Sequence, residues 1–254
     1  MKKTLLVSGD SYTDPNWLSE FHPELDTSWP KWPEILAKKL NMNCVNLGKA
    51  GAGNEYIYSS LLDYISNPSI SNDSIGLVIT GWSQIQRKDY QQGQAGRWTN
   101  VRNDPHGDAF SLANKSLKFY LSFQYMCEKF NLNYYQIQMI NFHSDLLSGL
   151  KYGHGEAYKN PSLLKIKMKY QYDKEKDTKR VLKCILSYDK KLNTNKFMGW
   201  PIAKELGGFT LCSKGSPIFS KDDEYDEYKV SNLDDHPNAK GQLKIAEYIH
   251  DRLG

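Results

Sequence analysis

The chain has 254 residues, of which 39% are hydrophobic and 24% are charged, and its formal net charge is +4. These proportions argue against a disordered chain, and no apolar run approaches the ~18 residues of a membrane-spanning helix. The four cysteines are scattered without a CxxC pair, which argues against a disulfide scaffold or a zinc site. A chain of 254 residues is long enough for one large α/β domain, and we expect a single domain over residues 1–254.

The first half of the chain alternates short apolar runs with helical patterns. Residues 4–7 form the first expected strand, because a compact apolar run that ends in a glycine-containing turn suits the interior of a parallel sheet. Apolar spacings of three and four predict a helix after Pro33. A second strand follows within 43–48, a second helix within 54–66 and a third strand within 76–82.

The second half continues the alternation between two long polar segments. Residues 88–111 and 144–233 interrupt the pattern, and we expect loops or a cap there, with a Lys- and Tyr-rich insertion over 144–233. A helix over 112–130 leads into a fourth strand over 134–142, and 238–254 form a closing helix. Strands that alternate with helices predict an α/β fold, a three-layer α/β/α sandwich around a central parallel sheet.

Three polar stretches follow predicted strands directly, at residues 8–14, 47–54 and 80–87. In parallel sheets the ligand crevice lies beyond the carboxyl ends of the strands. We therefore expect these stretches to meet at one edge of the sheet and to form the functional site there.

Positive charge is concentrated between Lys151 and Lys196, a segment that contains 13 basic and five acidic residues. A solvated, lysine-rich surface is the usual meaning of such a run, and a face that attracts an anionic polymer is the alternative. We take the first meaning and expect no nucleic-acid partner. The opening MKKTLLV is like a signal peptide, but its apolar run stops at Val7, short of the ~7 residues of an h-region. This predicts a cytoplasmic protein, or a component of a particle assembled there.

One serine and one histidine stand where catalysis would need them. A serine hydroxyl becomes a strong nucleophile only when a base takes its proton, and a histidine oriented by a carboxylate is the usual base. Ser11 follows the first predicted strand, and His236 lies just before the closing helix in LDDHPNAKGQ. The sheet could bring these two residues together.

Three stretches, SGDSYTD, NLGKAGAGN and DDHPN, resemble successive blocks of the SGNH hydrolases, also called the GDSL family. The resemblance implies a flavodoxin-like sheet and an esterase that uses no cofactor or metal. It implies that Ser11 is the nucleophile, that His236 is the base, and that the N–H groups of Ser11 and Gly51 line the oxyanion hole. It also implies that Asp10 supports the turn around the nucleophile. Some similar proteins are encoded by bacteriophages. If this chain is also encoded by a phage, it is expected to be associated with the virion.

Two departures from the family pattern concern the oxyanion hole and the acid. The third block of the family supplies an Asn side chain to the oxyanion, but this chain reads GWSQ, with Ser83 at that position. We expect the Ser83 hydroxyl to replace it, and the loss of a full donor would reduce transition-state stabilisation by about 2.7–4 kcal/mol. The family pattern Asp-x-x-His would place the acid at Leu233. We favour Asp234, which can curl back to His236, and expect Asp235 to be solvated or to cap a helix.

Three further residues are candidates near the site. Asn54 could cap the following helix, which we expect rather than a catalytic role. Arg87 could bind an anionic substrate, although a structural ion pair is the commoner role. Trp82 is the best aromatic candidate for lining the substrate pocket.

The sequence thus predicts a carboxylic ester hydrolase that acts through an acyl-enzyme. Aromatic and basic loops favour a short acyl group on a carbohydrate or another polar alcohol. An inactive module of the same fold, serving as a glycan-binding or structural part of a larger assembly, is the alternative. The sequence leaves open whether the chain forms a homo-oligomer or belongs to a particle.

Overall fold

The protein is described by a computed structural model over residues 2–93, 96–101, 108–142, 174–213, 216–219 and 222–253. Within these ranges five parallel strands form one sheet in the order β2-β1-β3-β6-β7. The strands are β1 (Thr4–Gly9), β2 (Asn43–Asn46), β3 (Ile75–Trp82), β6 (Tyr134–Gln138) and β7 (Phe197–Met198).

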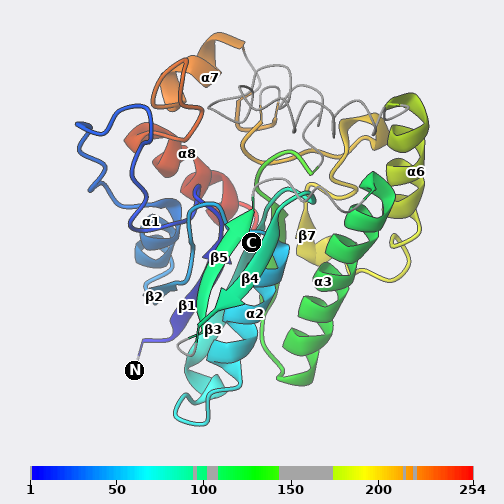
Figure 1. Ribbon diagram of the computed structural model, residues 1–254. Coiled ribbons are helices and arrows are strands. Elements are labelled where there is room, and N and C mark those ends of the chain that lie inside the picture. The colour runs from blue at the N-terminus through cyan, green and yellow to red at the C-terminus, as the bar shows by residue number, and fades with distance from the viewer. Residues whose placement is uncertain are drawn as a thin grey trace.

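Helices cover both faces of the sheet (Figure 1), which confirms the predicted three-layer sandwich. On one face α1 packs against α8, and on the other α3 packs against α2 and α6. A shorter helix, α7, lies beside α8. The helices are α1 (Trp32–Lys39), α2 (Asn54–Ile65), α3 (Ala109–Lys129), α6 (Lys174–Leu186), α7 (Asp222–Tyr228) and α8 (Ala239–His250), with 3-10 turns at η1 (Asn72–Ser74), η3 (Thr194–Lys196) and η4 (Lys204–Leu206).

Successive side chains of each central strand point to opposite faces, as the pleat of a strand requires. Leu6 of β1 and Val78 of β3 belong to the core cluster under α2, α3 and α6. Their neighbours Leu5, Val7 and Leu77 belong to the cluster under α1 and α8. All five are at most 3% exposed, and burial of each such side chain stabilises the fold by about 1.5–3 kcal/mol.

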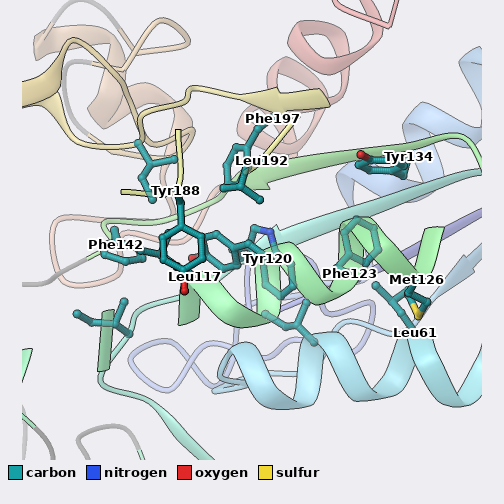
Figure 2. Close-up of a cluster of buried hydrophobic side chains, with 14 of the residues drawn as sticks. Leu61, Leu117, Tyr120, Phe123, Met126, Tyr134, Phe142, Tyr188, Leu192 and Phe197 are labelled. Atoms are coloured by element: carbon teal, nitrogen blue, oxygen red, sulfur yellow. The ribbon is translucent and has the colours of Figure 1, made fainter. Parts of the chain in front are cut away.

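Aromatic rings fill the larger of the two clusters (Figure 2). Tyr120 of α3 contacts the rings of Phe142 and Phe197, with centroids 6.3 and 5.5 Å apart. Phe123, one turn further along α3, meets Tyr134 of β6 edge to face at 5.6 Å. These contacts fix α3 against the β6 side of the sheet.

The two segments expected as loops contain more regular structure than predicted. Residues 88–111 hold an antiparallel hairpin of β4 (Lys88–Gln92) and β5 (Arg97–Val101), and α3 begins at Ala109. The expected insertion at 144–233 contains α6, β7 and α7. Its residues 144–173, with five of the 13 basic residues of the basic run, lie outside the described ranges. The hairpin escaped prediction because its strands are largely polar, and β7 because it is only two residues long.

No helix of the described part combines the length and the apolar character needed to cross a lipid bilayer. All four cysteines are free thiols.

The strand order determines at which edge of the sheet the candidate site lies. From β1 the chain moves outward to β2 and then returns across β1 to β3 and beyond, so the topology switches between β1 and β3. A crevice forms at such a switch point, beyond the carboxyl ends of the strands. Gly9 and Gly81 are register partners near those ends, so the stretches that follow β1 and β3 begin side by side.

Candidate active site

A tight turn at the end of β1 presents Ser11. The carbonyl of Asp10 accepts hydrogen bonds from the N–H groups of Thr13 (2.9 Å) and Asp14 (3.0 Å). Asp10 Oδ1 also accepts the N–H of Tyr12 at 3.1 Å, a side-chain-to-backbone bond that favours a turn. Ser11 therefore follows Asp10 within a closed turn, where it is 9% exposed.

Ser11, His236 and Asp234 form a continuous hydrogen-bonded chain. His236 Nε2 lies 2.8 Å from Ser11 Oγ, and His236 Nδ1 lies 2.6 Å from Asp234 Oδ1. The Asp234 side chain is buried, whereas that of His236 is 26% exposed. The two ends of the chain meet here as the sequence predicts, with a geometry that allows the imidazole to take the Ser11 proton.

The loop that carries Asp234 and His236 is closed on itself. The Val230 N–H donates to the His236 carbonyl at 2.8 Å, and the Ser231 N–H donates to the Asp234 carbonyl at 3.1 Å. The His236 N–H donates to Asp234 Oδ1 at 3.1 Å, which keeps the carboxylate beside the ring. Directly afterwards the Asn238 side chain caps α8 by accepting the Gly241 N–H at 3.0 Å. The capped helix thus fixes the loop at the site.

The alternative acid, Asp235, points elsewhere. Its side chain is 65% exposed, and its nearest cation is Lys229 Nζ at 3.8 Å. Its carbonyl accepts the Tyr12 hydroxyl at 3.1 Å, so its backbone contacts the turn that carries Ser11. The minus-two carboxylate, Asp234, is the one that contacts His236, as the sequence analysis favoured.

Ser19 holds the second oxygen of Asp234. Its buried hydroxyl donates to Asp234 Oδ2 at 2.5 Å. Burial acts to raise the pKa of Asp234, but the hydrogen bonds from His236 and Ser19 outweigh it and lower the pKa to about 2. Asp234 is therefore ionised throughout the neutral range.

Two aromatic rings enclose the His236 imidazole. Trp17 stacks on it with ring centroids 4.6 Å apart and an interplanar angle of 29°. Tyr12 lies tilted on it at 4.8 Å. The sequence gives no signal for Trp17 or Ser19, because the segment between β1 and α1 shows no periodic pattern and resembles no block of a known family.

Asp10 supports the turn, as expected, and is also the centre of a buried polar network. It is fully buried, and its Oδ2 accepts the Ser83 hydroxyl at 2.9 Å and Arg87 at 3.2 Å. Arg87 also donates to the Ala52 carbonyl at 3.0 Å, so it forms the structural ion pair that was the commoner expectation. A buried carboxylate requires such partners, because desolvation alone would be expensive.

The expected role of Ser83 in the oxyanion hole needs correction. Its side chain is fully buried, and its hydroxyl proton is directed to Asp10 Oδ2. A hydroxyl has a single proton to donate, so Ser83 has none left for an oxyanion. The short side chain instead supports Asp10 from β3.

The loop after β2 packs directly against the turn that carries Ser11. A Cβ at Gly48 would lie 2.7 Å from the carbonyl carbon of Thr13, closer than real contacts allow, so only glycine fits. The Ala50 N–H donates to Asp14 Oδ2 at 2.8 Å. Gly51 follows with a φ of +76°, in the left-handed region that favours glycine.

Asn54 has a structural role at the start of α2. The helix begins at Asn54 and its N-cap is Gly53, so the expectation that Asn54 caps the helix is wrong. Its carboxamide accepts the Ser83 N–H at 2.8 Å and donates to the Ser83 carbonyl at 3.3 Å, which joins α2 to the end of β3.

Trp82 does not line a pocket. It is fully buried, stacks on Tyr120 at 4.5 Å and donates its Nε1–H to Gln136 Oε1 at 2.9 Å. As the last residue of β3 it points into the core, while its neighbour Ser83 turns to Asp10. The prediction of a pocket residue is therefore wrong.

Across the described ranges, no group of three or more His, Cys, Asp or Glu side chains is arranged to hold a metal ion.

Known proteins resemble the chain in structure rather than in sequence. No protein-family model and no curated protein matches it. A lipase from a goat rumen metagenome is similar with a TM-score of 0.50 at 10% identity, over 99% of this chain and 97% of that one. A member of the lipolytic G-D-S-L family from Veillonella parvula has a TM-score of 0.44 at 11% identity, over 98% and 97%. A catalytic mutant of an acetylxylan esterase from Geobacillus stearothermophilus has a TM-score of 0.46 at 12% identity, over 100% and 96%.

At such identities the likeness concerns the fold. The sheet order, the helices on both faces and the match along nearly the whole chain agree with one another. The chain therefore has a three-layer α/β/α fold like that of this lipase.

Proposed function

We propose that the chain is a serine esterase that forms an acyl-enzyme on Ser11. One observation carries the proposal, namely the unbroken chain from Ser11 Oγ to His236 Nε2 (2.8 Å) and from His236 Nδ1 to Asp234 Oδ1 (2.6 Å). A buried carboxylate, an oriented imidazole and a hydroxyl in this order form the arrangement that activates a serine.

In the first step Ser11 Oγ attacks the carbonyl carbon of the ester. Its proton passes to His236 Nε2, and the electron pair of the C=O bond moves to the oxygen. The N–H groups of Ser11 and Gly51 stabilise this oxyanion. When the tetrahedral intermediate collapses, the bond to the alcohol oxygen breaks and His236 returns the proton to the leaving alcohol.

In the second step water hydrolyses the acyl-enzyme. His236 takes a proton from the water, whose oxygen attacks the acyl carbon, and then protonates Ser11 Oγ as the bond to it breaks. The acid is released and the free enzyme is restored. Asp234 remains ionised in both steps and stabilises the transient imidazolium.

We further propose a short acyl group, such as acetyl, on a polar alcohol such as a carbohydrate. The small exposed fraction of Ser11, 9%, favours a compact group at the attacked carbonyl. The polar alcohol rests on the aromatic and basic content of the sequence.

Labelling with a fluorophosphonate probe tests the nucleophile. We expect the wild type to be labelled, Ser11→Ala to lose the label, and Ser69→Ala, which alters an exposed serine, to keep it. Rates on p-nitrophenyl acetate, butyrate and octanoate and on acetylated xylose then test the acyl group. An unreactive wild type would contradict the esterase and favour an inactive module that serves in binding or assembly.

A further inference from the structure

The proposed oxyanion hole lacks a side-chain donor, because the Ser83 hydroxyl is directed to Asp10. We propose that the carboxamide of Asn100, on the β4–β5 hairpin, supplies this hydrogen bond beside the N–H groups of Ser11 and Gly51. The inference rests on the proposed esterase function and adds a catalytic residue to it. Side-chain amides are common donors to the oxyanion of acyl transfer.

The hairpin is anchored over the loop that carries Gly51. Asp89 of β4 accepts the N–H groups of Gly53 (2.8 Å) and Tyr56 (2.9 Å) at the start of α2. From β5, the Trp98 ring meets Tyr56 edge to face at 5.5 Å. Lys49 Nζ donates to the Trp98 carbonyl from the same loop. These contacts tie both strands of the hairpin to the loop after β2 and to the first turn of α2.

The pairing of β4 with β5 places Asn100 on the face of the hairpin that contacts the loop carrying Gly51. Asn100 pairs with Asp89 across the hairpin, and directly opposite residues of antiparallel strands share one face. Trp98, two residues earlier on β5, shares this face as well. Asn100 accordingly lies on Gly51, because a Cβ built at Gly51 would be 2.9 Å from both Nδ2 and Oδ1 of Asn100.

The spacing of the two donors fits one shared oxygen. Donors that each lie 2.7–3.1 Å from the same oxyanion must be within about 6 Å of each other. A Cβ lies about 2.5 Å from the nitrogen of its own residue, so Asn100 Nδ2 is within about 5.4 Å of the Gly51 nitrogen. Because Nδ2 and Oδ1 are equally near, rotation of the carboxamide by a half turn keeps an N–H donor there.

Other carboxamides near the loop are already engaged. Asn46 Nδ2 donates to the Thr13 carbonyl at 2.7 Å and to Glu34 at 2.8 Å. Asn54 is held by the backbone of Ser83 on both sides. Within the described ranges no hydrogen bond holds the Asn100 carboxamide, so it is the amide beside Gly51 that can donate to a ligand.

Kinetics of three variants on p-nitrophenyl acetate test the inference. Asn100→Leu keeps the shape of the side chain without its donor, and we expect kcat to fall about 10²–10³-fold with KM within threefold of the wild type. Asn100→Gln retains an amide, so its kcat should exceed that of Asn100→Leu. Thr99→Val, on the opposite face of the same strand, should keep the wild-type kcat. Thermal melting of each variant checks that it is folded.

Two results would overturn the role of Asn100 while leaving the esterase intact. One is a kcat of Asn100→Leu within threefold of the wild type. The other is a kcat of Asn100→Leu equal to or above that of Asn100→Gln, which packing alone would explain. A wild type without Ser11-dependent hydrolysis is a different result, and it would overturn both proposals together.

Discussion

Replacement of Ser19 by alanine should reveal how firmly Asp234 is held. The change removes the hydroxyl that donates to Asp234 Oδ2 at 2.5 Å. It leaves one oxygen of a buried carboxylate without its partner, while Oδ1 still accepts from His236. We expect Ser19→Ala to reduce both the stability of the fold and the rate of acyl transfer.

The size of the effect follows from the charge of the acceptor. A hydrogen bond to an ionised group contributes about 1.5–3 kcal/mol. The pKa of Asp234, about 2 against an ordinary 3.8, corresponds to roughly 2 kcal/mol in favour of the ionised form. Among the groups that lower this pKa, Ser19 comes second after His236, so it accounts for only part of that energy. We therefore expect the free energy of unfolding at pH 7 to fall by about 1–2 kcal/mol. A carboxylate freed to rotate orients His236 less well, and a barrier higher by about 1.4 kcal/mol lowers kcat about tenfold.

The stability that Asp234 contributes depends on pH. Because the folded-state pKa of Asp234 is depressed, its ionised form stabilises the fold above the ordinary pKa, and this stability is lost as pH falls through about 2. In Ser19→Ala the pKa should rise toward 3.8. The stability difference between wild type and variant should then be constant above about pH 5 and shrink between pH 4 and pH 2.

Urea denaturation at pH 7, 5 and 3, together with kcat and KM on p-nitrophenyl acetate at pH 7, measures these effects. Ser111→Ala is the matched control, since it removes an exposed hydroxyl that donates to Asp108 at 3.2 Å, and its kcat should equal that of the wild type. A stability loss of the same size at pH 7 and pH 3, with kcat within twofold of the wild type, would refute the reasoning.

Three more changes test the surroundings of the site. Arg87→Met leaves the buried Asp10 carboxylate without its cation and should lower the free energy of unfolding by about 3–5 kcal/mol. Adding Asp10→Asn to the same chain should restore part of this loss, and urea denaturation of the single and double variants measures both effects. Trp17→Phe keeps an aromatic face on the His236 imidazolium and should retain more kcat than Trp17→Leu, so equal rates would contradict a ring contribution. Ser83→Ala should reduce stability by about 1–3 kcal/mol yet leave kcat near that of the wild type, and a hundredfold loss of kcat would return Ser83 to the oxyanion hole.

The central layers of the fold could be predicted from the sequence because hydrophobic periodicity reports burial directly. Leu5, Leu6 and Val7 form an apolar run that both faces of the sheet bury, and such a run is typical of a parallel strand. The β4–β5 hairpin lacks this signal, since its side chains make specific polar contacts such as that of Asp89 with α2. Its position depends on tertiary contacts that no local pattern encodes.

The site was predictable where sequence order fixes geometry. Ser11 and His236 follow from the ends of β1 and the start of α8, which the topology brings together. The direction of a single side chain does not follow from order. Trp82 and Ser83 are adjacent, yet one turns into the core and the other to Asp10, and nothing in GWSQ distinguishes the two.

The pairing of a nucleophile near residue 10 with a base near residue 236 also has a consequence for biosynthesis. The ribosome synthesises the chain from its N-terminus at about 5–20 residues per second. Ser11 is then exposed to the cell long before His236 has been translated, and during that time its hydroxyl has no partner to take the proton. For the proposed esterase, reactivity therefore begins only when α8 has docked and His236 lies beside Ser11.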